Sequence, residues 1–376
     1  MNFEAGSRFL YSNTNFWLLG KIIEKLSRLS LAEFLEDRIF GPLGMTRTRH
    51  TPDVMVPVEG LATGYLPRGT GFVRAGHGFP LGGEGGLVSG IEDLALWGRA
   101  LSLNLLSGGV VEAQLQELLP FTNGSLSTYA RGLEVEEWRG LKLVSHGGLW
   151  PGFKTAFLRV PARRLTVLLA TNNGGLDAHA MGMAVMEAAL EGDAVLHAVA
   201  AMPKLDALDG TFTTADGATL DLWRDEHGKP MARQHGVAFP LGARADGMLH
   251  ALRPGFRFAI ERGAAGLVLH TDAGHKAALL PVAAPRQALA VEGVFHCADV
   301  GATWRVDADG WRAEGPHAKS EANRAEGLTA DLARFHMAGA LYDSWWDVRL
   351  IRDAAGAVSA LEANGARARG LRFERV

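Results

Sequence analysis

The hydrophobic pattern of this chain changes character near residue 200, and this change limits the architectures open to it. Before that point, helix-like stretches precede strand-like runs, and the two kinds do not alternate regularly. After it, short runs of alternating apolar and polar residues are separated by turn sequences such as Asp-Gly and Asn-Gly. The first pattern predicts an α+β unit with an antiparallel sheet, and the second predicts all-β structure.

Two helices are expected near the start of the chain. Apolar residues recur at helical spacing over residues 17–26, with Thr14 as the expected cap. Ser30 and Glu33 form a capping box, which predicts that a second helix begins there. Gly41-Pro42 is expected to end that second helix, because proline cannot continue a helix interior.

Strand-like runs and one further helix complete the α+β unit. The runs are bounded by turn residues such as Arg139-Gly140. We expect strands near residues 133–136, 141–145, 154–160 and 165–171, followed by a helix over residues 178–190.

The all-β half contains a faint internal repeat. Leu208–Phe212, which reads Leu-Asp-Gly-Thr-Phe, recurs as Val291–Phe295, which reads Val-Glu-Gly-Val-Phe. Two small antiparallel β-barrels fit this spacing, because a barrel closes its sheet and leaves no open edge. We therefore predict three domains, over residues 1–200, 201–284 and 285–376.

The composition excludes several classes of function. The 376 residues carry a net charge of -3, so no basic field is available for nucleic acid or for an acidic membrane surface. The longest apolar run, Leu165 to Ala170, is too short to cross a membrane. No basic segment leads into an apolar stretch after Met1, which favours a cytoplasmic protein without a signal peptide. The single cysteine, Cys297, excludes internal disulfides and cysteine-based zinc sites.

Tyr11 and Asn13 lie two residues apart, directly before the first expected helix. In acyl transfer by a serine hydroxyl, some group must take the hydroxyl proton and return it to the leaving amine. A phenol can do so where nearby cations lower its pKa, and a carboxamide beside it can orient the substrate amide. Taken alone, Tyr-x-Asn is a common tripeptide, and a buried tyrosine followed by an asparagine helix cap is the simpler interpretation.

His146-Gly147-Gly148 follows a strand-like run. The two glycines allow a substrate backbone to approach the strand closely, and the imidazole can supply a proton or a positive charge. A hairpin turn with an incidental histidine is the alternative interpretation.

Other hydrolytic chemistries lack their residues. The sequence has no Gly-x-Ser-x-Gly elbow and no His-Glu-x-x-His pair, so neither an α/β-hydrolase nucleophile nor a zinc ligand set is present. Residues 82–86 read Gly-Gly-Glu-Gly-Gly and lack the Gly-Lys-[Ser/Thr] ending of a phosphate-binding loop. We expect them to form a tight loop beside a substrate-binding cleft. We expect no metal and no cofactor.

The sequence around these residues resembles the penicillin-recognising serine hydrolases, the superfamily that contains the serine β-lactamases and DD-peptidases. The resemblance covers residues 1 to about 190, in order, and implies a β-lactamase-like domain with helices and an antiparallel sheet. It is carried by Phe3-x-x-Gly6-Ser7-x-Phe9-x-Tyr11-Ser12-Asn13-Thr14, Phe40-Gly41-Pro42-Leu43-Gly44-Met45-Thr46, Gly83-x-Gly85-Gly86-Leu87-Val88-Ser89, and His146-Gly147-Gly148 with Gly152-Phe153.

Within the superfamily, a histidine at the start of the third motif and two following β-barrels look like the D-aminopeptidases. Those enzymes release an N-terminal D-residue from peptides and amides. The resemblance implies that Tyr11 is the catalytic tyrosine and that His146 is a cation or proton carrier. It also implies that Asn13 and Gly148 contact the substrate and that the Leu149 N–H forms one half of the oxyanion hole.

The chain departs from the family at the nucleophile. The family places a serine, with a lysine three residues later, ahead of the tyrosine motif, and none of the lysines here has a serine three positions before it. We therefore expect an N-terminally truncated D-aminopeptidase-like serine hydrolase, inactive as it stands. The alternatives are a non-catalytic relative that acts as a binding protein, or a β-lactamase, DD-peptidase or esterase of the same superfamily.

The expected partner is a small peptide or amide substrate, with no nucleic acid and no membrane, and the resemblance allows a homodimer. In the D-aminopeptidases a loop of the last barrel reaches the active site and helps to select the free amine of the substrate. Residues 335–343 are the candidate for that loop, and a buried barrel strand followed by a turn is the alternative.

Overall fold

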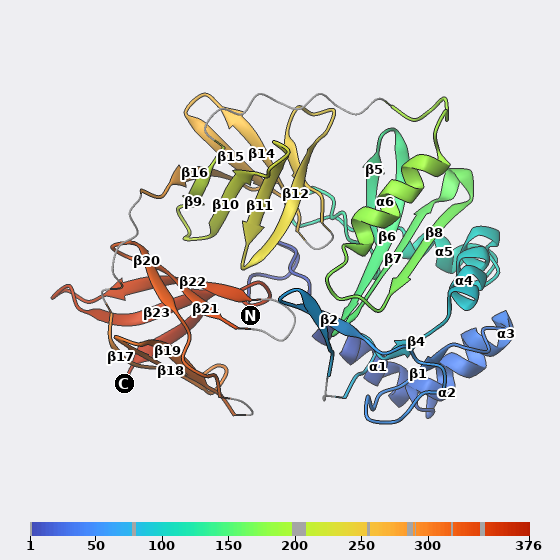
Figure 1. The fold of residues 1–376 in the computed structure, drawn as a ribbon, viewed down its shortest axis with the longest axis horizontal. Helices are drawn as coiled ribbons and strands as arrows, with labels where there is room; N and C mark the ends of the chain where they lie inside the picture. The colour runs from blue at the N-terminus through green and yellow to red at the C-terminus, as the bar shows by residue number, and fades with distance from the viewer. Residues whose placement is uncertain are drawn as a thin grey trace. The chain divides into compact units, whose positions relative to one another are not determined.

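The computed structural model describes residues 2–76, 80–197, 208–253, 256–283, 289, 291–316, 319–338 and 343–376. It divides into two compact units (Figure 1). One comprises Leu10–Ala198, and the other comprises Met1–Phe9 with Val199–Val376. Each unit is described by itself below.

The three helical stretches predicted for the Leu10–Ala198 unit are present, although two of their boundaries differ. The capping box is confirmed, because Ser30 accepts from the Glu33 N–H and the Glu33 side chain accepts from the Ser30 N–H. The helices are α1 (Asn13–Ser27), α2 (Leu31–Leu35), a π-helical turn (Glu36–Phe40), α3 (Gly41–Leu43), α4 (Ile91–Leu103), α5 (Val110–Leu115) and α6 (Ala178–Ala189).

The two corrected boundaries have simple physical reasons. Thr14 does not cap the first helix, because α1 already begins at Asn13 and Ser12 occupies the cap position in extended conformation. Gly41-Pro42 does not end the second helical stretch. Pro42 lies in the first turn of α3, where no N–H is required, and the chain leaves at Gly44 with a left-handed φ of 72°.

The sheet of this unit is antiparallel, as predicted. Its four strands are β5 (Glu134–Trp138), β6 (Leu141–Trp150), β7 (Phe153–Val160) and β8 (Leu165–Thr171), in the order β5-β6-β7-β8. Helix α6 packs against β7 and β8 and buries a core that includes Leu143, Leu158 and Met186 (Figure 1). Two short pairs lie outside this sheet: β1 (Arg49–His50) with β4 (Leu87–Val88), and β2 (Tyr65–Arg68) with β3 (Gly71–Arg74). The α+β architecture is therefore confirmed.

The second unit contains two β structures of eight strands each. The first is a closed barrel around an apolar core that includes Leu222, Phe239 and Ile260. Its strands are β9 (Gly210–Thr213), β10 (Thr219–Arg224), β11 (Pro230–Gln234), β12 (Val237–Ala243), β13 (Leu249–Ala251), β14 (Phe258–Gly263), β15 (Gly266–Thr271) and β16 (Lys276–Pro281).

The second β structure is a nearly closed barrel. Its edge strands are β19 and β20, and isolated bridges from Trp311 to Asn323 and from Glu314 to Lys319 join β19 to the segment that leads into β20. The Trp304 and Phe373 rings stack in its core with centroids 4.1 Å apart. The strands are β17 (Gly293–Cys297), β18 (Ala302–Asp307), β19 (Gly310–Glu314), β20 (Ala325–Thr329), β21 (Leu332–Met337), β22 (Ser344–Arg352), β23 (Val358–Asn364) and β24 (Leu371–Arg375).

The faint sequence repeat has a structural counterpart. Gly210 and Gly293 each begin the first strand of a barrel, and their φ angles are 147° and 146°. Side chains strongly disfavour this backbone region, so glycine is required at the same point of both copies. The prediction of two small antiparallel barrels is therefore confirmed.

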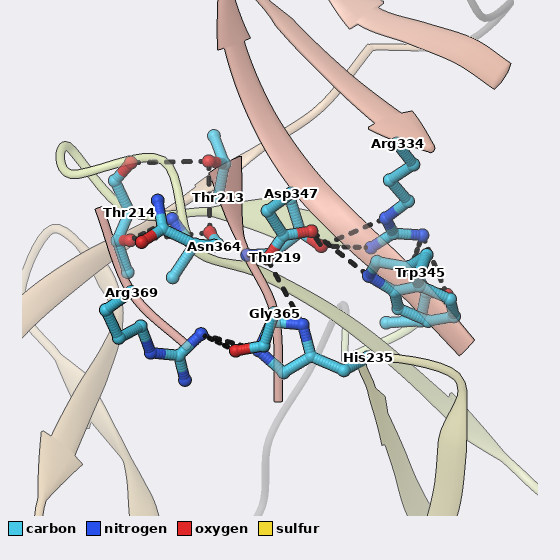
Figure 2. A network of polar contacts seen from close by, with 12 residues as sticks. Thr213, Thr214, Thr219, His235, Arg334, Trp345, Asp347, Asn364, Gly365 and Arg369 are labelled. Atoms are coloured by element: carbon cyan, nitrogen blue, oxygen red, sulfur yellow. Dashed lines mark hydrogen bonds and ion pairs between the residues drawn. The ribbon is translucent and has the colours of Figure 1, made fainter. Parts of the chain in front are cut away.

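A buried polar network joins the two barrels (Figure 2). Asp347 on β22 accepts hydrogen bonds from the backbone N–H and the hydroxyl of Thr219 on β10, at 2.9 and 2.6 Å. Arg334 on β21 donates to the Thr219 hydroxyl and forms an ion pair with Asp221 at 2.9 Å. His235, in the turn between β11 and β12, places its Nδ1 4.0 Å from Asp347 Oδ2.

None of the helices in the described ranges has the length and apolar character needed to cross a membrane.

Candidate active site

Tyr11 stands at the entrance to helix α1. The chain is extended at Ser12 and turns into the helix at Asn13, so Tyr11 lies two residues before the first helical residue. Gly20 fixes the helix against the glycine-rich loop, because a Cβ atom there would lie 3.0 Å from the Gly83 backbone nitrogen. The segment 82–86 is thus a tight packing loop against α1.

His146 lies in strand β6, on the sheet face opposite the α6 core. Side chains alternate along a strand, so Ser145 and His146 point to opposite faces. Ser145 is buried and pairs with Leu158 of the α6 core, whereas His146 pairs with Phe157. The strand therefore presents the imidazole away from α6 and directs the neighbouring serine hydroxyl into the core.

The structure brings Tyr11 and His146 together, although 135 positions separate them in the sequence (146 minus 11). Their ring centroids lie 6.2 Å apart. A third ring, that of Tyr129, lies edge-on to Tyr11 at 5.9 Å and is 6.1 Å from the His146 ring. The three side chains form one aromatic cluster that contains two phenols and one imidazole.

Tyr129 is the site residue that sequence reasoning missed. Its hydroxyl lies 3.3 Å from His146 Nε2, within hydrogen-bond distance. It precedes strand β5, and its backbone N–H donates to the Ser127 hydroxyl at 3.0 Å. It follows a threonine in a loop without any recognised spacing, so no signal in the local sequence distinguishes it from an ordinary surface tyrosine.

Gly148 has a steric reason to be glycine. A Cβ atom at this position would lie 2.5 Å from Thr155 Oγ1 on the neighbouring strand. Leu149 follows it and is 42% exposed near the end of β6. Asn13 is exposed as the first residue of α1. The substrate-binding roles of Asn13, Gly148 and Leu149 remain predictions.

Three serines, Ser7, Ser12 and Ser145, lie near the two motifs. Ser145 is buried, and its hydroxyl has no hydrogen-bond partner among the residues described. The Ser12 side chain forms no cap hydrogen bond to α1 within the described part of the chain. No group of three or more His, Cys, Asp or Glu side chains that could hold a metal ion occurs in the described ranges.

The candidate barrel loop at residues 335–343 is described only in part. Phe335 is fully buried in strand β21, which agrees with a barrel strand at that point. Residues 339–342 lie outside the described residues. The role of this segment in substrate selection stays a prediction.

Two curated D-aminopeptidases are similar to part of this chain. The D-aminopeptidase of Gluconobacter oxydans is 28% identical over 180 residues, which cover 46% of this chain and 33% of the relative. The D-aminopeptidase of Brucella anthropi is 29% identical over 177 residues, or 46% of this chain and 33% of the relative. The matched part thus spans about a third of the length of these curated relatives.

Solved structures of the same kind also align. The D-amino acid amidase from Ochrobactrum anthropi, in its complex with L-phenylalanine amide, is 27% identical, covering 44% of this chain and 50% of that chain, with a TM-score of 0.38. The octameric penicillin-binding protein homologue from Pyrococcus abyssi is 18% identical and covers 84% of this chain and 65% of that chain, with a TM-score of 0.46. The family model described as Beta-lactamase matches residues 1–190, half of the chain, and through that match this protein belongs to the Beta-lactamase family.

Proposed function

We propose that the Leu10–Ala198 unit forms two walls of a serine-hydrolase site that acts on D-amino-acid amides or on peptides with an N-terminal D-residue. The observation that carries the proposal is the approach of Tyr11 to His146 at 6.2 Å between ring centroids. The similarity to D-aminopeptidases supports the choice of substrate class, and the Beta-lactamase family match over residues 1–190 includes both side chains.

The chemistry assigned to these side chains is proton transfer. When a serine hydroxyl attacks an amide carbonyl, its proton must leave, and the departing amine must gain a proton. We assign Tyr11 to that transfer, with His146 as the group that holds or exchanges a proton beside it. The amide of Asn13 would orient the substrate, and the Leu149 N–H would stabilise the oxyanion.

The nucleophile is the part that this chain lacks. The 376 residues contain no serine followed three residues later by lysine, and the nearby Ser145 hydroxyl points into the α6 core. The proposed activity therefore requires a nucleophile that the residues assigned above do not supply. The chain by itself should bind substrate without turning it over.

The test separates binding from turnover. D-phenylalanine amide and L-phenylalanine amide are titrated into the purified chain while the NMR signals of Tyr11 and His146 are followed, and release of ammonia is assayed in the same samples. We expect the D-enantiomer alone to shift these signals, with no ammonia above that from the Tyr11→Phe variant.

Two outcomes would contradict the proposal. Hydrolysis by the purified chain that survives both Tyr11→Phe and His146→Ala would show that chemistry occurs elsewhere in the protein. Equal shifts with both enantiomers would remove the stereospecific part of the assignment.

A further inference from the structure

We propose that Tyr129 is a positioning residue of this site, which together with the Gly147 carbonyl holds His146 in its Nδ1–H tautomer and makes Nε2 the nitrogen that exchanges protons. The inference deepens the proposed function by naming the atom through which His146 would act. It rests on two contacts of one imidazole and on the fact that a carbonyl oxygen cannot donate.

The first contact fixes the proton on Nδ1. His146 Nδ1 lies 2.6 Å from the carbonyl oxygen of Gly147. A carbonyl is only an acceptor, so the hydrogen of this bond must belong to Nδ1. In the neutral imidazole one nitrogen is protonated and the other is not, and Nε2 is therefore the bare nitrogen.

The second contact directs the bare nitrogen. Tyr129 Oη lies 3.3 Å from Nε2, so in the neutral form of His146 the phenol donates and Nε2 accepts. When Nε2 gains a proton, the roles reverse and Nε2–H donates to the phenol oxygen. The hydroxyl of Tyr129 can serve both forms without movement of the ring.

The backbone around Tyr129 holds the phenol in place. Ser127 links to Tyr129 twice, since the Tyr129 N–H donates to the Ser127 hydroxyl and that hydroxyl donates to the Tyr129 carbonyl. An isolated bridge from Tyr129 to Glu134 joins the loop to the start of β5. The edge-on contact between the Tyr129 and Tyr11 rings, at an interplanar angle of 87°, ties the position of the phenol to that of Tyr11.

This arrangement changes the role expected of His146. A fixed cation would need both ring nitrogens to be protonated throughout the reaction, and neither contact requires that. With Nδ1 committed to a backbone carbonyl, one proton can be taken up and released at Nε2, beside the phenols of Tyr11 and Tyr129. We therefore assign His146 to proton exchange at Nε2, with Tyr129 acting through His146 and not on the substrate.

The experiment observes the tautomer directly. The ¹⁵N shifts of His146 are measured by long-range ¹H–¹⁵N correlation in the full chain, at a pH at which the imidazole is neutral, and they are assigned by comparison with His146→Gln. The expected result is a protonated Nδ1 and an unprotonated Nε2 that accepts a hydrogen bond. In Tyr129→Phe, the Nε2 signal should move toward that of a nitrogen without a donor, while the circular dichroism spectrum and the melting temperature are retained.

Tyr65→Phe is the matched control, because Tyr65 belongs to the same unit but lies on β2 and is 40% exposed. That variant should leave both His146 nitrogen signals in place. A protonated Nε2 in the unaltered protein would overturn the proposal, as would a Tyr129→Phe variant that is folded and has an unchanged Nε2 signal. Neither readout depends on hydrolysis, so the positioning role can fail while the proposed function stands, and the reverse also holds.

Discussion

His235 Nδ1 lies 4.0 Å from Asp347 Oδ2, and both side chains are almost completely buried where the two barrels meet. Their exposed fractions are 2% and 1%. Burial lowers the pKa of His235 to about 3, and the charge of the adjacent Arg369 adds to that effect. Burial raises the pKa of Asp347 to about 6, against the opposing hydrogen bonds from Thr219. The pKa values of these two groups in one network are therefore shifted in opposite directions from their ordinary values.

The first prediction concerns the pH dependence of the free energy of unfolding. The contribution from His235 should nearly cancel the contribution from Asp347. Between about pH 4 and pH 6, the native state holds one extra proton on Asp347, and the unfolded state holds one extra proton on His235. The His235 contribution to the free energy of unfolding therefore rises with pH in this window, whereas that of Asp347 falls. Each slope is at most about 1.4 kcal/mol per pH unit.

Single variants should show the two pH dependences separately. In His235→Asn the free energy of unfolding should fall with rising pH relative to the unaltered protein, since only the Asp347 contribution is left. Asparagine suits the left-handed φ of 48° at this position. In Asp347→Asn the relative slope should be positive. Urea unfolding at pH 4, 5 and 6 measures both, and slopes of the same sign in the two variants would contradict the opposed titrations.

The second prediction concerns the buried guanidinium of Arg334. It is 2% exposed, pairs with Asp221 and lies over the Trp345 ring at 4.2 Å. Arg334→Met should lower the free energy of unfolding of the barrel unit by about 3–5 kcal/mol, because removal of one partner leaves buried carboxylates uncompensated. Arg312→Met is the control: the Arg312–Asp307 pair is 43% and 46% exposed, and its loss should cost about 0–1 kcal/mol. Equal losses in guanidinium chloride unfolding would show that burial does not set the energy of these pairs.

The third prediction tests the steric role of Gly148. Gly148→Ala would place Cβ 2.5 Å from Thr155 Oγ1, so either the Thr155 side chain or the strands must shift. We expect destabilisation of about 1–3 kcal/mol from this overpacking. Thr155→Ala removes the hydroxyl and should restore most of the loss in the double variant, as measured by a thermal double-mutant cycle. Additive losses in that cycle would mean that the cost arises elsewhere.

The fourth prediction concerns the outer edge of β8. In the described part of the chain no other strand pairs with this edge, and the strand Leu-Thr-Val-Leu-Leu-Ala-Thr carries no charge. The opposite edge, β5, reads Glu-Val-Glu-Glu-Trp and is protected by its carboxylates. Because an uncharged edge is a template for strand pairing, the chain should self-associate with rising concentration.

A charge on that edge should suppress the association. Ala170→Lys, at an exposed position of β8, should reduce the average mass seen by light scattering at high concentration. Glu137→Ala on β5 is the control and should leave β8-mediated association as it is. If Ala170→Lys associates as strongly as the unaltered chain, the contact does not use the β8 edge.

Much of the local structure could be predicted because it depends on neighbouring residues. The runs ending at Val160 and Thr171 are strands β7 and β8, and the capping box at Ser30 opens a helix. The ends of elements were less predictable. Pro42 is accommodated in a first helical turn, where its missing N–H costs nothing, and this depends on where the preceding helix happens to stop.

The candidate site was predictable only where a motif marked it. Tyr11 and His146 belong to short motifs that resemble those of a known family. That resemblance implies that the two residues lie close together, as they do in the structure. Tyr129 belongs to no recognised motif. Its approach to His146 Nε2 depends on how the loop before β5 folds over the sheet. No local pattern in the sequence carries that information.

The sequence by itself determined the α+β character of the first half, the two-barrel repeat and the two motifs that contain Tyr11 and His146, because these follow from periodicity, turn residues and short motifs. Tertiary structure alone decided the rest. Arg334 meets Asp221 across 113 positions, and β8 has the apolar sequence of an interior strand but stands at an edge. Such relationships come from the packing of distant segments, and each depends on which faces are buried together and not on the residues adjacent in the chain.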